Sequence, residues 1–144
     1  MIINEAGLAL IKHFEGFSQE IYLCAAGKRT IGYGHLLKNG EDFKGGITLN
    51  AAENLLLDDL RNAEMAVKRL ISEKINDNQF SALMSFTFNL GSAALQRSSL
   101  RRKINSGYIS EAGDEFLRWI FAGGKKYSGL YRRRYAEKLL FEMD

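Results

Sequence analysis

The chain has 144 residues, of which 46% are hydrophobic, and this is enough for one domain with a buried core. No apolar run approaches the roughly 18 residues that a membrane-spanning helix needs, so stable membrane insertion is not expected. The N-terminus lacks the pattern of a secretory signal, and we therefore expect the chain to accumulate in the cytoplasm. The single cysteine, Cys24, excludes an internal disulfide. A net charge of +3 favours an anionic partner, such as a cell wall or a nucleic acid.

The N-terminal part of the sequence predicts one helix followed by a β-hairpin. Asn4 is a suitable N-cap, and Gly16 stands where the helix would end, which puts Glu15 in its last turn. Two β-prone runs follow at 20–23 and 29–33, and a turn that contains glycine separates them.

The rest of the chain has mainly a helical period. Ile47 is a candidate edge strand, and Thr48 can cap a single long helix from about 49 to 72. Asn76 followed by Gln79 predicts a capping box for a very apolar, central helix. Further helices are expected at about 93–105, 110–120 and 129–142. The predicted fold class is α+β and predominantly helical.

Glu15 is well placed to act as a general acid. Such an acid must stay protonated near neutral pH until it protonates a leaving oxygen. The negative end of the helix dipole and burial against neighbouring aromatic residues both favour the protonated carboxyl. Considered alone, the same residue would more often be a solvated glutamate before a C-cap glycine. The residues around it therefore decide between this interpretation and that of a general acid.

The residues around the predicted hairpin form a distinctive pattern. It consists of Glu15-Gly16-Phe17, Tyr22, Cys24, Gly27 and Thr30-Ile31-Gly32-Tyr33-Gly34-His35. Three further blocks lie at 79–91, at 116–124 and at 129–137. In order and spacing these blocks, which together span about residues 8 to 142, resemble the phage-type lysozymes of glycoside hydrolase family 24.

That resemblance implies hydrolysis of the β-1,4 bond between N-acetylmuramic acid and N-acetylglucosamine in bacterial peptidoglycan, without a cofactor. The family's catalytic set is an acid, a second residue nine positions on that is usually Asp and occasionally Cys, and a threonine six positions later. The matching residues here are Glu15, Cys24 and Thr30. With two histidines and one cysteine, the chain has no persuasive metal site.

The resemblance also implies a single lysozyme-like domain. A small lobe at about 14–50 would carry a short antiparallel sheet, and the long helix at about 49–72 would join it to a helical lobe at about 73–144. The N-terminal helix would belong to the helical lobe, and the substrate cleft would lie between the lobes.

Cys24 stands where a carboxylate is usual, and this leaves the mechanism open. A thiol with a pKa of about 8.5 is only a few per cent ionised at pH 7 and is a weak base, so base catalysis is poorly supported. Sulfur is better suited to attack the anomeric carbon, which would give retention of configuration, and Lys28 and Arg29 could raise the thiolate fraction. The other course is residual inversion, in which Thr30 and Glu15 act with little help. A disabled site is the remaining interpretation.

Several residues near the hairpin have expected roles. The resemblance implies a structural ion pair between His35 and Asp59. Tyr33 either stacks on a sugar or packs against the protein. Gly32 and Gly34 indicate a bulge or a close approach of the backbone to a neighbour, which is either a sugar or protein.

Two expected substrate contacts lie in the helical part of the chain. The resemblance places the Phe-Asn-x-Gly segment near the cleft, where Asn89 would bind an N-acetyl group. In the run of arginines, Arg133 or Arg132 is the candidate to hold Glu15 or a peptide carboxylate in place. The alternative for this run is a solvated helix face.

Three classes of function remain. The first is a phage or prophage endolysin, a monomer held in the host cytoplasm until a separate membrane-permeabilising protein gives it access to peptidoglycan. The second is a wall-binding or regulatory module that kept the fold and lost activity through Cys24. The third, a basic nucleic-acid binder, is not favoured, and we expect no nucleic-acid partner.

Overall fold

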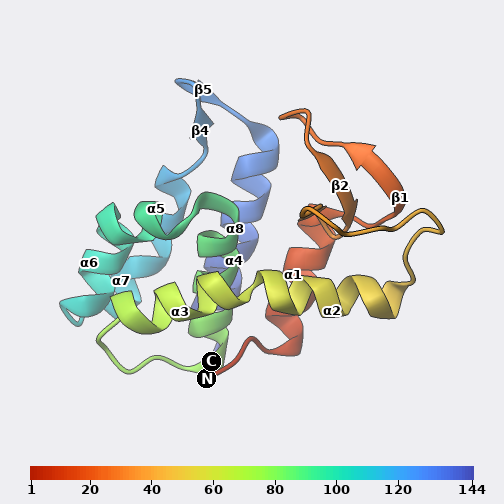
Figure 1. Cartoon of the computed structure of the whole chain (residues 1–144). Helices are drawn as coiled ribbons and strands as arrows, with labels where there is room; N and C mark the ends of the chain where they lie inside the picture. Colours follow the sequence, from red (N-terminus) through yellow and green to blue (C-terminus); the bar gives the residue numbers. More distant parts are fainter. The chain divides into compact units, whose positions relative to one another are not determined.

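The computed structural model describes residues 1–144, and it confirms the α+β, predominantly helical class (Figure 1). The helices are α1 (Glu5–Glu15), α2 (Leu49–Asp59), α3 (Arg61–Leu70), α4 (Asp77–Leu90), α5 (Ser92–Arg97), α6 (Ser99–Asn105), α7 (Ile109–Ala112), the 3₁₀ helix η1 (Gly113–Arg118) and α8 (Ser128–Glu142). The strands are β1 (Ser18–Leu23), β2 (Arg29–Gly32), β3 (His35–Leu36), β4 (Phe121–Ala122) and β5 (Lys125–Lys126).

The chain divides into two compact units. Residues Lys12–Arg61 form the first, here called the sheet unit, and residues Met1–Ile11 with Asn62–Asp144 form the second, here called the helical unit. Helix α1 therefore contributes its first turns to the helical unit and its last residues to the sheet unit. Asn4 caps this helix as expected, since its side-chain oxygen accepts a hydrogen bond from the Gly7 amide at 2.9 Å.

The sheet unit contains three antiparallel strands in the order β1-β2-β3. Strands β1 and β2 form the expected hairpin, with Tyr22 opposite Thr30. The third strand is β3, which follows β2 through a tight turn, whereas the expected strand at Ile47 does not form. The Ile47 amide donates one hydrogen bond to the Gln19 carbonyl at 2.9 Å, and an isolated bond of this kind does not extend into a ladder.

Gly32 allows helix α2 to pack closely on the sheet. A Cβ at this position would lie 3.2 Å from the Ala52 side chain, and the backbone has a positive φ of 66°. Buried Ile31, Ile47 and Ala52 form the small core of this unit. The close neighbour expected at Gly32 is therefore protein, not a sugar.

The expected long helix over about 49–72 is two helices, α2 and α3, with a break at Leu60. The Leu60 amide keeps the helical bond to the Leu56 carbonyl at 2.9 Å but shares its proton with the Asp58 carbonyl, so the interruption is confined to this one residue. Leu56, Leu60 and Ala63 are all buried, and the apolar period continues across the break. A break that leaves this period intact gives no signal in the sequence. Thr48 does cap α2, as predicted, by accepting from the Ala51 amide.

In the helical unit, α4 forms the centre and packs against α5 and α8 (Figure 1). The predicted capping box is present, because Asn76 and Gln79 each bind the other's backbone amide at 2.8 Å. Phe86 is fully buried, and its ring meets those of Phe116 and Trp119 edge to face at 5.6 Å. Such ring pairs stabilise a core by about 0.5–1.5 kcal/mol beyond the area that they bury.

Two of the later expected helices are divided. The range 93–105 holds α5 and α6, because Ser98 is extended and its hydroxyl accepts from the Arg101 amide, which starts a new helix. The range 110–120 holds the short α7 and the tighter η1. Strands β4 and β5 form a second, two-stranded hairpin that the sequence did not predict.

The arginine run is not a solvated helix face, because only Arg132 is exposed. Arg134 is completely buried, and its Nε lies 2.6 Å from Glu137 Oε1, also completely buried. The Ser85 hydroxyl donates to the other carboxylate oxygen of Glu137 at 2.5 Å, and Arg133 lies 3.4 Å from that same oxygen. A carboxylate in this position has its charge balanced within the core.

His35 connects strand β3 to helix α2 and to the loop that follows the strand. Its Nδ1 lies 2.8 Å from Asp59 Oδ2, and its Nε2 lies 3.0 Å from Glu41 Oε1. Burial alone would lower the pKa of His35, but the hydrogen bonds and charges of Glu41 and Asp59 outweigh it, so the pKa is raised. The imidazole therefore favours its charged form between the two carboxylates.

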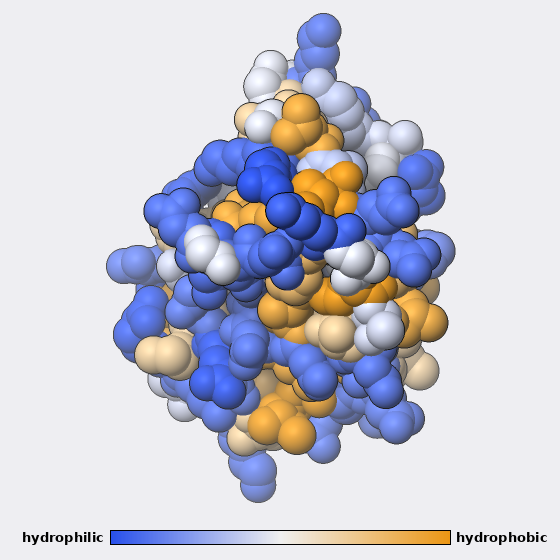
Figure 2. All heavy atoms as spheres, turned by 45° about the vertical axis from the view of Figure 1, so that its right-hand side comes forward, coloured by the Kyte–Doolittle hydropathy of each residue, from blue (hydrophilic) through white to orange (hydrophobic).

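The surface is mixed in character. Hydrophilic residues cover much of the face in Figure 2, with hydrophobic patches between them. None of the helices combines the length and the apolar character needed to cross a membrane.

Asp59→Asn should lower the melting temperature by roughly 3 °C at pH 5.5 and by much less at pH 8. The folded state holds the His35 proton more tightly than the unfolded state, because the folded pKa is raised. This stabilisation is complete below the unfolded pKa of about 6.5 and is lost as the pH rises through the folded pKa. Thermal melts followed by circular dichroism at both pH values measure the difference.

The control for this experiment is Asp58→Asn. Asp58 precedes Asp59 in the same helix, but it is exposed and pairs only with the exposed Arg61 at 3.4 Å. This variant should show little change at either pH. Equal losses at both pH values in Asp59→Asn would contradict a pairing that depends on the His35 charge.

Glu137→Gln should lower the free energy of unfolding by about 3–5 kcal/mol, because it leaves the buried Arg134 guanidinium without a counter-charge. Urea denaturation gives the value. Glu111→Gln, which changes an exposed carboxylate in α7, should stay within about 0.5 kcal/mol of the parent. A Glu137→Gln effect as small as that of the control would show that the buried pair contributes little.

Candidate active site

Glu15 is the last residue of helix α1, as predicted. The Gly16 amide closes the helix by donating to the Lys12 carbonyl at 2.9 Å, and Gly16 then takes a positive φ of 74°. This left-handed glycine ends the helix directly after the carboxylate-bearing residue. The side chain of Glu15 is half-buried.

The carboxylate of Glu15 lies against the turn between β2 and β3. A Cβ on Gly34 would be 2.8 Å from Glu15 Oε1, which is closer than real Cβ contacts come. Gly34 also has a positive φ of 76°, so any other residue would be strained there as well as crowded. The second glycine of the Ile-Gly-Tyr-Gly run therefore makes room for the acid.

Cys24 lies at the start of the turn between β1 and β2. Its amide donates to the Lys28 carbonyl at 2.9 Å, and its own carbonyl accepts from the Gly27 amide at 2.8 Å. The thiol is partly exposed and is not in a disulfide.

The environment of Cys24 favours the thiolate. Hydrogen bonds from the backbone amides of Lys28 and Ala26 lower the pKa of the thiol, and the Thr30 hydroxyl acts in the same direction. Desolvation raises the pKa of the thiol, and its effect is smaller than that of either backbone bond but larger than that of the Thr30 hydroxyl. The turn therefore presents backbone donors to a sulfur that carries negative charge.

Thr30 is buried and lies beside two acceptors. Its Oγ1 donates to the Lys28 carbonyl at 2.9 Å, and its hydroxyl lies near enough to the Cys24 thiol to lower the pKa of that thiol. A threonine hydroxyl has one proton, so it can serve only one of these acceptors at a time. Lys28 thus organises the turn through its backbone, with the amide facing the thiol and the carbonyl facing the hydroxyl.

All three predicted catalytic residues belong to the sheet unit. The first hairpin brings Cys24 and Thr30 into contact, and the β2–β3 turn holds the Glu15 carboxylate. The sequence predicted these three residues but not the amides of Ala26 and Lys28. The only signal for those donors was Gly27, whose positive φ of 75° shapes the turn.

Tyr33 is engaged within the sheet unit. Its ring lies 5.5 Å from that of Phe17, and Lys12 Nζ lies 5.6 Å from its centroid. Lys12 also forms an ion pair with Glu53 of α2. These contacts fix the position of the Tyr33 ring, which is half-buried, and its contact with a sugar stays a prediction.

The other two expected substrate contacts are in the helical unit. Asn89 is exposed near the C-terminal end of α4. Arg133 is buried, and its Nε lies 3.3 Å from the Ser85 hydroxyl in addition to the contact with Glu137. Arg133 therefore has a structural role in this unit, and its substrate role stays a prediction.

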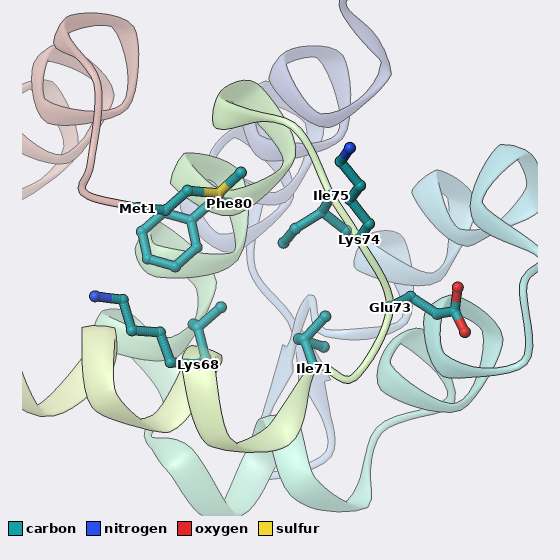
Figure 3. A pocket seen from close by; sticks show the side chains of 8 residues that line it. Met1, Lys68, Ile71, Glu73, Lys74, Ile75 and Phe80 are labelled. Atoms are coloured by element: carbon teal, nitrogen blue, oxygen red, sulfur yellow. The ribbon is translucent and has the colours of Figure 1, made fainter.

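An apolar pocket in the helical unit lacks the groups that catalysis needs. It has a volume of about 360 Å³, and its walls include Met1, Ile71, Ile75 and Phe80 (Figure 3). The one carboxylate at its edge, that of Glu73, points away from Met1 and Phe80 (Figure 3). The chemistry is concentrated instead in the sheet unit.

Comparison with known proteins identifies the family. The phage lysozyme family model matches residues 12–137. The endolysin of Acyrthosiphon pisum secondary endosymbiont phage 1 is 40% identical over 148 residues, which cover 99% of each chain. A solved P22 lysozyme variant is 34% identical with a TM-score of 0.89, and 98% of each chain is covered.

Some relatives are longer. The endolysin of Bacillus phage B103 is 40% identical over 143 residues, which are 98% of this chain but 54% of that endolysin. The chain thus spans about half the length of this relative. Because the family match covers most of the chain, including the residues from Glu15 to Thr30, the chain belongs to the phage lysozyme family.

Proposed function

We propose that this chain is an endolysin that cleaves the β-1,4 bond between N-acetylmuramic acid and N-acetylglucosamine in peptidoglycan. The observation that carries this proposal is the group of reactive side chains in the sheet unit. Cys24 and Thr30 are in contact, and the Glu15 carboxylate lies against the neighbouring turn. Membership of the phage lysozyme family supports the same activity.

Glu15 is the general acid of the proposed reaction. Its protonated carboxyl gives a proton to the glycosidic oxygen as the bond to the muramic acid C1 breaks, and the N-acetylglucosamine leaves with a free 4-hydroxyl. The position against Gly34 limits the movement of the carboxyl. A fixed acid needs less reorganisation to reach the leaving oxygen.

Cys24 is the proposed nucleophile. Its thiolate attacks C1 as the glycosidic oxygen leaves, so that a C–S bond replaces the C–O bond. Water then attacks C1, the Glu15 carboxylate takes the proton from that water, and the sulfur leaves as thiolate. Two inversions at C1 give overall retention. The backbone amides of Ala26 and Lys28 stabilise the thiolate before it attacks C1 and again after it is released.

Thr30 is the proposed positioning residue. Its hydroxyl hydrogen-bonds to Cys24, and Thr30 is buried in the centre of the sheet, which fixes where that hydroxyl lies. Tyr33, Asn89 and Arg133 are the proposed substrate contacts.

The proposed biological setting is lysis of a bacterial host. The enzyme would act as a monomer, remain in the host cytoplasm until lysis, and reach the wall after a separate protein permeabilises the membrane. The relatives are named endolysins, which supports a role at the cell wall.

Glu15→Gln should lower the initial rate of clearing of a peptidoglycan suspension by roughly 10²- to 10⁴-fold, because the amide N–H is far too weak an acid to protonate the leaving oxygen. Loss of turbidity over time measures the rate. Glu20→Gln is the matched control, since Glu20 is exposed on strand β1. It should clear at close to the parental rate.

The clearing assay also tests the alternative function. If the parent binds peptidoglycan but does not clear it, the chain is a wall-binding module and the proposed activity is wrong. Clearing by Glu15→Gln at the parental rate would mean that another residue is the acid.

Modification of Cys24 by iodoacetamide should proceed with a pH midpoint below that of a free cysteine, because the backbone amides lower the pKa of the thiol. The modified enzyme should lose clearing activity. Proton NMR of the first product of the parent should show retention at C1. Inversion would rule out the sulfur nucleophile, and full activity after modification would make Cys24 a bystander.

A further inference from the structure

A second, polar pocket lies in the sheet unit beside the first hairpin. It has a volume of about 380 Å³ and is formed where the turn before β2 meets β3 and the loop that follows it. Three cationic residues line it, namely Lys28, Arg29 and Lys38, and all three are exposed. None of the three forms a salt bridge, and only the charge of Lys38 acts, without such a contact, on Glu41, so their charged groups are available to a ligand.

The one carboxylate in the pocket is already engaged. Glu41 accepts from the Lys38 amide at 2.6 Å and lies 3.0 Å from His35 Nε2. The backbone hydrogen bond from Lys38, together with the bond to His35, lowers the pKa of Glu41, which therefore stays ionised and held in place. The three cations and this single anion leave the pocket with a net positive charge.

The pocket also has an apolar side, formed by Leu36 and Leu37. Leu36 is 46% exposed, so part of it faces a ligand. Arg29 and Leu37 are held together at this edge, because the Leu37 amide donates to the Arg29 carbonyl at 3.0 Å. A ligand that combines carboxylates with short apolar groups matches such a wall better than a bare phosphate does.

Lys28 belongs both to the pocket and to the turn that holds Cys24. The side chain of Lys28 lines the pocket, while its backbone carbonyl accepts from the Cys24 amide at 2.9 Å. In peptidoglycan each muramic acid can carry a short peptide with alanine methyl groups and free carboxylates. A glycan strand that presents the C1 of a muramic acid to Cys24 would carry such a peptide on the same sugar.

We propose that the pocket lined by Lys28, Arg29 and Lys38 binds the carboxylates of a peptidoglycan stem peptide. This inference rests on the proposed function, and it adds a peptide-recognition site to the glycan chemistry. The cations hold the carboxylates, and Leu36 and Leu37 contact the alanine methyl groups. The site favours wall that still carries peptides over bare glycan.

The test uses the soluble peptide L-Ala-γ-D-Glu-L-Lys-D-Ala and the Glu15→Gln variant of the full chain, followed by NMR. The peptide should shift the amide resonances of residues 36–40. In this background the pair Arg29→Gln and Lys38→Gln should weaken peptide binding by roughly 2- to 30-fold, the range that two exposed ion pairs provide. The pair Lys44→Gln and Arg69→Gln removes the same charges from exposed positions outside the pocket and should change binding by less than about twofold.

Three outcomes would overturn the proposal. The first is the absence of shifts at residues 36–40, and the second is equal weakening by the control pair, which would indicate an unspecific charge effect. The third is tighter binding of glycerol phosphate at the same amides, which would assign the pocket to a phosphate polymer. Binding of the isolated peptide requires no hydrolysis. A lack of peptide binding is therefore distinguishable from a failure of the parent to clear peptidoglycan, which would contradict the proposed function.

Discussion

The candidate site depends on one steric constraint, the absence of a side chain at Gly34. Glu15 Oε1 lies only 2.8 Å from the position that a Cβ would take, and the positive φ of Gly34 gives the tight turn that returns the chain into β3. The same turn places His35 opposite Asp59 and Glu41. One glycine therefore links the position of the acid to the attachment of the sheet to helix α2.

The turn that holds Cys24 explains how a thiol can take the place of a carboxylate at this position. A carboxylate at this position would be ionised at neutral pH without help, whereas a thiol needs donors that stabilise its anion. The amides of Lys28 and Ala26 supply them. Stabilising the thiolate also makes it a weaker base, so the same donors that increase the ionised fraction favour nucleophilic attack over activation of water.

How far the sequence predicts this molecule depends on whether an interaction is local. The capping box at Asn76 and the end of α1 at Gly16 follow from neighbouring residues, and both were predicted correctly. The break at Leu60 was missed because the apolar period continues through it. The burial of Arg134 was missed because its partner Glu137 is held by Ser85, which lies 52 positions away from Glu137 and has no sequence signal of its own.

The single proton of Thr30 connects the state of the sulfur to the geometry of the site. With a neutral thiol, the hydroxyl is free to donate to the Lys28 carbonyl, the bond seen at 2.9 Å. With a thiolate, the stronger acceptor is the sulfur, and the proton is drawn toward Cys24. The hydroxyl that supports the nucleophile thus also stabilises the departing sulfur, because the sulfur becomes a thiolate again as water attacks C1 from the opposite face.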